Sequence, residues 1–190
     1  MRYLNKTEQS EIIKQGWRYV TESHRPKIRA ALLVEQNSFC AYTEHYINEA
    51  IDSPDIEHFD DRLKNSDEDN YWNWYLVHHK TNMHKGQIKN SLPIMLPYDE
   101  TLPDRIHYIN GAFRAVNEKD TEAVNLIKFL DWNNPDLAND RAEKVQLIKE
   151  IRGFHNGDDA AFIAYITARP QYLSFITVLE AELGLSLSPD

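Results

Sequence analysis

The sequence predicts an α+β protein that is mostly helical, with one small strand–loop–strand–helix unit between N-terminal and C-terminal helices. Three observations support this prediction. Apolar residues recur three or four apart over most of the C-terminal half, two short β-type segments stand near the middle of the chain, and Pro and Asn-Gly signals separate the segments. We expect a single domain over residues 1–190, because one hydrophobic core usually serves about 100–200 residues.

Residues 1–37 are expected to form the N-terminal helices. One helix is predicted over residues 8–20, where Ile12, Ile13, Trp17 and Val20 have helical spacing. A second is predicted from Ser23, with Pro26 in its first turn, through Gln36.

Residues 38–90 contain the predicted strand–loop–strand–helix unit. A short extended element is expected over 38–47, a strand over 56–59, a second strand over 73–77 and a helix over 80–88. The acidic residues between the strands are expected to lie in a solvated loop over 60–70; they are Asp60, Asp61, Asp67, Glu68 and Asp69. His78 and His79 are expected on opposite faces of the second strand.

Residues 91–190 are expected to be mostly helical and to pack around the central unit. A Pro-bounded linker over 92–97 and an Asn110-Gly111 hairpin lead into this part. Helices are predicted over 121–130, 139–151, 158–168 and 173–183.

Composition limits the possible functions. The net charge of −9 argues against bulk coating of nucleic acid, although residues 1–30 carry seven basic and three acidic side chains and are therefore locally +4. The single cysteine, Cys40, excludes an intramolecular disulfide and a zinc site made mainly of thiolates. No apolar run reaches the length of a membrane span and residues 1–10 lack the apolar centre of a secretion signal, so we expect a cytoplasmic protein that does not bind membranes.

The residues that indicate chemistry lie in the central unit. Glu57 and His58 are adjacent at the end of a predicted strand, where both can face one site. A neutral imidazole can accept a proton from water near pH 7, and carboxylate and amide oxygens are the hard ligands that Mg²⁺ prefers. Asn73, Asn82 and Lys85 follow at the second strand and the helix. These residue types are those of a one-metal phosphodiesterase.

This pattern resembles the HNH, or ββα-metal, endonucleases. The resemblance implies that His58 is the general base, that Glu57 and Asn82 hold Mg²⁺ or Mn²⁺, and that Asn73 holds the base and the loop in place. It also implies a phosphate contact for Lys85, with His84 as a metal ligand in the His-Asn-His version. The expected fold is then a small ββα-metal core embedded among helices.

A closer resemblance, over about residues 35–150, is to the PtuB-like HNH endonucleases of Septu and retron-associated antiphage systems. The features that carry it include Cys40-Ala-Tyr-Thr-Glu44, Ile56-Glu-His-Phe59, Trp72-Asn-Trp74, Tyr108-Ile-Asn-Gly111 and Leu130-Asp-Trp-Asn133. It implies a nuclease subunit that works beside an ATPase partner, with DNA as the substrate and RNA left open. It also includes Arg141, to which it gives no role.

The sequence departs from these relatives at the two CxxC knuckles that bind structural zinc in the family. The matching positions read Cys40-x-x-Thr43 and His78-x-x-Thr81, and two potential ligands do not make a tetrahedral site. We therefore expect no structural zinc, with packing by Phe39, Tyr42, Trp72 and Trp74 in its place. A rebuilt site from Cys40, His45, His78 and His79 is the alternative.

A second class of function stays open from the sequence alone. The nuclease motif can survive as a scaffold in a non-catalytic adaptor whose helices bind a protein partner. The presence of Glu57, His58, Asn73 and Asn82 together favours the enzyme, because a decayed site is expected to lose at least one of them.

Overall fold

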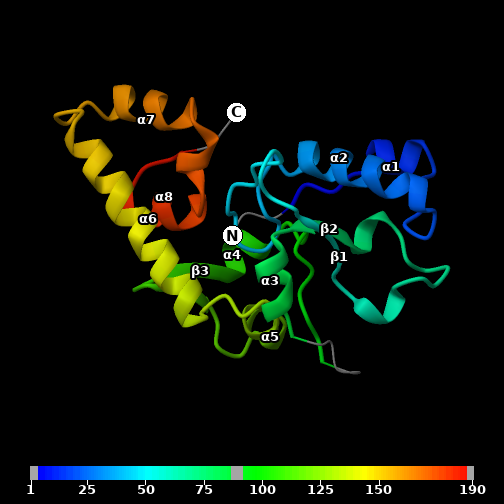
Figure 1. The fold of residues 1–190 in the computed structure, drawn as a ribbon. Helices are drawn as coiled ribbons and strands as arrows, with labels where there is room; N and C mark the ends of the chain where they lie inside the picture. Colours follow the sequence, from blue (N-terminus) through cyan, green and yellow to red (C-terminus); the bar gives the residue numbers. More distant parts are fainter. Residues whose placement is uncertain (1–3, 87–91, 188–190) are drawn as a thin grey trace.

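The computed structural model describes residues 4–86 and 92–187, and its elements follow one another as an α+β chain with two separate hairpins (Figure 1). The first half contains α1 (Glu11–Lys14), α2 (Arg25–Glu35), β1 (Asp55–His58), β2 (Trp74–Val77) and α3 (His79–His84). The second half contains α4 (Leu102–Arg105), β3 (Ile106–Ile109), β4 (Ala112–Ala115), α5 (Thr121–Phe129), α6 (Pro135–Gly153), α7 (Asp159–Thr167) and α8 (Ile176–Leu183).

The predicted strand–loop–strand–helix order is present in the middle of the chain. β1 and β2 pair antiparallel, with Glu57 opposite Tyr75 and His58 opposite Trp74. The chain enters α3 directly after β2, and both α2 and α3 contact this hairpin. The hairpin is buried because all four residues of β2 are in the interior.

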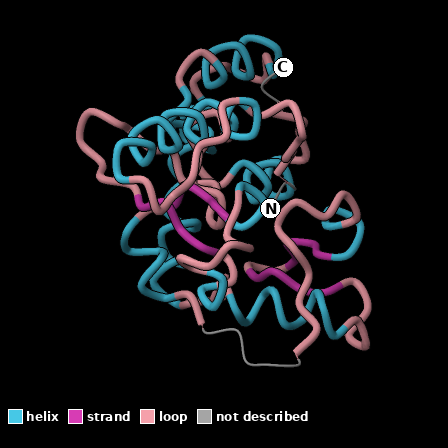
Figure 2. Tube along the Cα trace, turned by 90° about the vertical axis from the view of Figure 1, so that its right-hand side faces the viewer, coloured by secondary structure: helices cyan, strands magenta, loops and turns pink. Residues whose placement is uncertain are grey.

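The second hairpin forms where Asn110-Gly111 predicts it. β3 and β4 pair antiparallel, and Figure 2 shows them apart from the β1–β2 pair. Asn110 and Gly111 have φ values of 52° and 80°, in the left-handed region that a tight two-residue hairpin turn requires.

The C-terminal helices attach to the central unit through buried polar contacts. Trp132 is 1% exposed and its indole Nε1 donates a hydrogen bond of 2.7 Å to the carbonyl oxygen of Tyr42. The carboxylate of Glu44 accepts from the backbone N–H of Thr177 at the start of α8. Arg141 of α6, whose role the sequence leaves open, is buried and donates to the carbonyl of Trp132. The residue is therefore part of this packing.

The predicted C-terminal helices are confirmed, and the N-terminal helix prediction is wrong in its length. The sequence predicts a helix over residues 8–20, but α1 spans only Glu11–Lys14. Gly16 follows with φ 61°, a left-handed conformation that ends the helix. Val20 is 46% exposed, so the apolar spacing there does not mark a buried helical face.

Three local predictions in the central unit also need correction. Residues 38–47 form turns joined by a single isolated bridge between Phe39 and Tyr46, so the extended element is only a fragment. His78 and His79 lie beyond β2, at the N-cap and first residue of α3, so they do not alternate on a strand. The predicted helix over 80–88 is present as α3, which ends at His84, and residues 87 and 88 lie outside the described part of the chain.

Within residues 4–86 and 92–187, no helix combines the length and the apolar character needed to cross a membrane.

Candidate active site

The candidate site is built on the end of β1, where Glu57 and His58 are adjacent and buried. Glu57 is 8% exposed and His58 is 2% exposed, counted over the whole residue. Successive side chains of a strand point to opposite faces, so the contacts of Glu57 and His58 differ. Asp55 lies two residues before Glu57 and shares its face.

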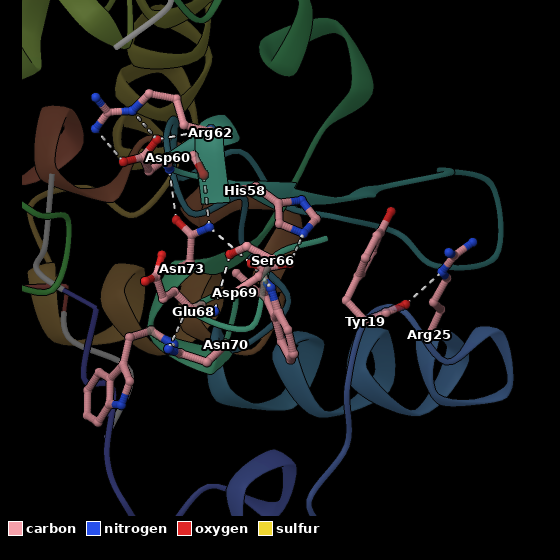
Figure 3. Close-up of polar contacts among 12 residues, drawn as sticks. Tyr19, Arg25, His58, Asp60, Arg62, Ser66, Glu68, Asp69, Asn70 and Asn73 are labelled. Carbon is pink, nitrogen blue, oxygen red and sulfur yellow. Dashed lines mark hydrogen bonds and ion pairs between the residues drawn. The ribbon is translucent and has the colours of Figure 1, made fainter. Parts of the chain in front are cut away.

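On the imidazole side, His58 lies against Asp69 (Figure 3). Nε2 of His58 is 3.0 Å from Oδ2 of Asp69, and both side chains are almost fully buried. The approach lies off the line of an ordinary N–H···O hydrogen bond, so the contact depends mainly on electrostatic attraction. The ring of Tyr19 packs edge to face against the imidazole at 4.4 Å between centroids. Nδ1 of His58 has no hydrogen-bond partner among the described residues.

Asp69 is held by its own hydrogen bonds. Its Oδ1 accepts from the indole Nε1 of Trp74 at 2.7 Å and from the amide Nδ2 of Asn73 at 3.1 Å. Burial raises the pKa of Asp69, but the contacts from His58, Asn73 and Trp74 outweigh it and leave the pKa below its usual value. Asp69 is therefore an ionised, oriented partner for His58. The sequence prediction of a solvated position for Asp69 is wrong.

Asn73 ties the β1–β2 loop together. Its amide oxygen accepts from the backbone N–H of Asp60 at 2.8 Å, and its Nδ2 donates to the carbonyl of Asp60 at 3.0 Å. Because the same amide also donates to Asp69, one side chain connects the start and the end of the loop. Asn73 therefore holds the loop and Asp69 together, and its role in positioning a base stays a prediction.

On the opposite side of β1, Lys85 lies against Glu57. The ammonium forms a buried ion pair with Oε1 of Glu57, and the two side chains are 8% and 10% exposed. The same ammonium donates to the backbone carbonyls of His58 at 2.8 Å and Phe59 at 3.2 Å. Three oxygens therefore converge on one positive charge at the end of β1. The phosphate contact of Lys85 stays a prediction, and in the structure its ammonium binds Glu57.

Asn82 lies one turn earlier on α3 and contacts Asp55. Its Nδ2 donates to Oδ2 of Asp55 at 3.1 Å, and Nδ1 of His79 is 2.8 Å from the same oxygen. The amide oxygen of Asn82 has no hydrogen-bond partner among the described residues, which leaves it available as a ligand. The side chain of His84 lies outside the part that the structure describes.

These donors suit a hard divalent cation in chemistry. Asp55 and Glu57 contribute carboxylates from one face of β1, and Asn82 contributes a free amide oxygen from α3. The convergence of three oxygens on the Lys85 ammonium shows that this place already stabilises a cation. In donor chemistry these residues match the Mg²⁺ or Mn²⁺ that the resemblance implies; in the structure Glu57 pairs with Lys85 and Asn82 contacts Asp55.

Residues at and beside the positions that match the family's zinc knuckles line a pocket. Thr43, His45, His78 and Thr81 line an open pocket of about 500 Å³ that α6 also borders. The rings of His45 and His78 are 5.0 Å apart, and Cys40 is buried at 1% exposure. In residues 4–86 and 92–187, no three His, Cys, Asp or Glu side chains gather in an arrangement that holds a metal.

Sequence reasoning missed three contributors to the site. Asp69 stands in an acidic run that is typical of an exposed loop. Asp55 begins the stretch that contains Glu57 and His58, but the resemblance gives it no role. Tyr19 comes from an N-terminal segment that is remote in sequence. Only the fold brings Tyr19 to the imidazole.

The chain matches no family model, no curated protein and no solved structure.

Proposed function

We propose that the protein is a metal-dependent endonuclease that hydrolyses phosphodiester bonds. The observation that carries the proposal is that Lys85, after α3, contacts Glu57 and the carbonyl of His58 on β1, while Asn82 of α3 contacts Asp55 on the same strand. His58 and the oxygens around the Lys85 ammonium lie on opposite faces of one strand end, and we propose that both halves act on the same phosphodiester, as the resemblance to HNH endonucleases implies.

His58 is the proposed general base. With Asp69 facing Nε2, the imidazole proton is held at Nε2 and the lone pair of Nδ1 accepts a proton from the attacking water. The buried carboxylate then stabilises the imidazolium that forms, in the way that an aspartate orients a catalytic histidine in hydrolases. Asn73 and Trp74 keep Asp69 in place during this step.

Glu57, Asn82 and Asp55 form the proposed cation-binding half of the site. A divalent ion bound there supplies Lewis-acid stabilisation of the phosphorane charge and of the leaving 3′ oxygen. Lys85, whose ammonium pairs with Glu57, must release that carboxylate for the ion to bind. Its charge then stays at the site, next to the phosphate.

DNA is the proposed substrate, by the resemblance to PtuB-like nucleases, with RNA as the alternative. The resemblance supplies no residues that read base edges, so we propose that sequence specificity is weak or supplied by a partner. The proposed partner is an ATPase of an antiphage complex, in line with the same resemblance.

One observation favours the non-catalytic adaptor as the second candidate. Lys85 occupies the oxygen cluster at Glu57, and His58 is only 2% exposed, which is the packing expected of a scaffold that needs neither metal nor water. The two candidates differ in their response to metal. The test is conversion of supercoiled plasmid to nicked circles by the purified full chain with Mg²⁺ or Mn²⁺, with and without chelator. A labelled RNA is cut in parallel to decide the substrate, and absence of cleavage of both substrates with either metal would favour the adaptor.

A further inference from the structure

We propose that Tyr19, Arg25 and Lys64 form the contact for backbone phosphates of the nucleic acid next to His58. This proposal rests on the proposed nuclease function and deepens it by naming where the strand binds. It concerns side chains from the N-terminal segment and the β1–β2 loop that belong to no part of the motif.

Tyr19 connects the basic residues to the imidazole. Figure 3 shows its ring between His58 and Arg25. The His58 ring lies at 4.4 Å, the Arg25 guanidinium carbon lies 4.7 Å from the centre of the Tyr19 ring, and the Lys64 ammonium lies 5.8 Å from it. Two positive charges are therefore grouped about the residue that covers the proposed base.

The two charges are not neutralised within the described part of the chain. Arg25 donates its Nε–H to the carbonyl of Tyr19 at 3.0 Å, and its terminal nitrogens have no partner among the described residues. Lys64 is exposed and has no carboxylate within ion-pair distance there. By contrast, Arg18 pairs with Asp67 and Arg62 pairs with Asp60.

The chemistry of this group suits a phosphodiester backbone. A guanidinium with two free terminal nitrogens can bind phosphate oxygens bidentately, and an exposed ammonium adds a point charge. The hydroxyl of Tyr19 has no described partner and can donate to a third oxygen. The chain as a whole carries a charge of −9, so a polyanion needs a local basic contact of this kind.

The test measures binding separately from cleavage. Fluorescence anisotropy with a labelled single-stranded DNA, its duplex and the matching RNA is recorded in chelator at several salt concentrations. The variants are Arg25→Gln, which keeps a donor for the Tyr19 carbonyl but loses the charge, and Lys64→Gln. Lys119→Gln, an exposed lysine in the turn between β4 and α5, is the matched control.

We expect each of the two variants to weaken binding about 3–10-fold and to reduce the slope of log K against log salt by about 0.7–0.9 per lost phosphate contact. Lys119→Gln should bind as wild type does. In the nicking assay, KM should rise in Arg25→Gln and Lys64→Gln while kcat stays within about twofold.

The possible outcomes distinguish this proposal from the proposed function. Wild-type binding and an unchanged salt slope in both variants, with plasmid cleavage intact, would overturn the phosphate contact and leave the nuclease standing. The phosphate contact would also be overturned, with the nuclease still standing, if wild type cleaves and the variants change only kcat. If wild type binds through Arg25 and Lys64 but cleaves no nucleic acid with either metal, the nuclease fails and the contact remains. A wild type that binds none of the three nucleic acids at low salt would overturn the contact.

Discussion

The Oδ2 atom of Asp69 lies 3.0 Å from Nε2 of His58, and both side chains are almost fully buried. We propose that this pairing orients the imidazole and favours the tautomer with its proton on Nε2. It also explains why the β1–β2 loop is tied down by Asn73, since the loop carries Asp69 to the imidazole.

Replacing Asp69 by Asn is expected to lower kcat, by up to the about 10²–10⁴-fold that a positioned base contributes. The amide removes the negative charge that holds the proton at Nε2, so the His58 tautomer should change. Long-range ¹H–¹⁵N spectra of the imidazole report that tautomer directly. Asp67→Asn in the exposed part of the same loop is the control, and an unchanged tautomer together with wild-type kcat in Asp69→Asn would contradict the assignment.

The amount of this structure that the sequence predicts differs between elements. The β1–β2–α3 order, the Asn110-Gly111 turn and the C-terminal helices follow from periodicity and turn chemistry, because these signals are local. The N-terminal helix is overestimated, because the left-handed Gly16 ends α1 before the apolar pattern does.

The sequence predicts only those residues of the candidate site that belong to the HNH-like motif or stand next to each other in the chain, such as Glu57 and His58. Asp69 and Tyr19 reach His58 through tertiary packing, and no local pattern marks them. The pairing of Lys85 with Glu57 is likewise a consequence of α3 packing on β1. Charge in an acidic run favours exposure, but three polar contacts on Asp69 reverse that preference.

Glu57→Gln is expected to weaken Mn²⁺ binding, because the substitution keeps the shape of the side chain and removes the ligand charge. Asn82→Ala should act in the same direction through loss of the amide oxygen. Isothermal titration with Mn²⁺ alone, on the full chain, measures both. Glu49→Gln, which lies on the exposed surface, is the control. Equal Mn²⁺ affinity in wild type, Glu57→Gln and Asn82→Ala would show that these residues are not the ligands.

The purified protein is expected to contain well under one zinc per chain, because Thr43 and Thr81 stand where two of the thiolates are required. Elemental analysis gives the zinc content, and thermal unfolding with and without chelator gives its contribution to stability. The midpoint should not change on chelation. Stoichiometric zinc with a midpoint that falls when the metal is removed would show that Cys40 and the nearby histidines rebuild the site.

Trp74 and Trp72 are expected to contribute different amounts to the stability of the central unit. Trp74 is 1% exposed, so Trp74→Ala should cost about 3–5 kcal/mol of unfolding free energy, as for other large buried aromatics. Trp72 is only partly buried against the core, so Trp72→Ala should cost less than Trp74→Ala. Urea unfolding of the two variants compares them under one condition. A larger loss for Trp72→Ala than for Trp74→Ala would contradict the packing described here.

The most direct test of the central claim is the rate of plasmid nicking by wild type, His58→Gln and His107→Gln in Mg²⁺ or Mn²⁺, each repeated with chelator. Glutamine can still donate to Asp69 but cannot accept a proton from water, and His107 is an exposed histidine on β3. The nuclease account predicts metal-dependent nicking by wild type and His107→Gln, with a rate about 10²–10⁴-fold lower in His58→Gln. Nicking that persists in chelator, or that proceeds in His58→Gln at the wild-type rate, would contradict it.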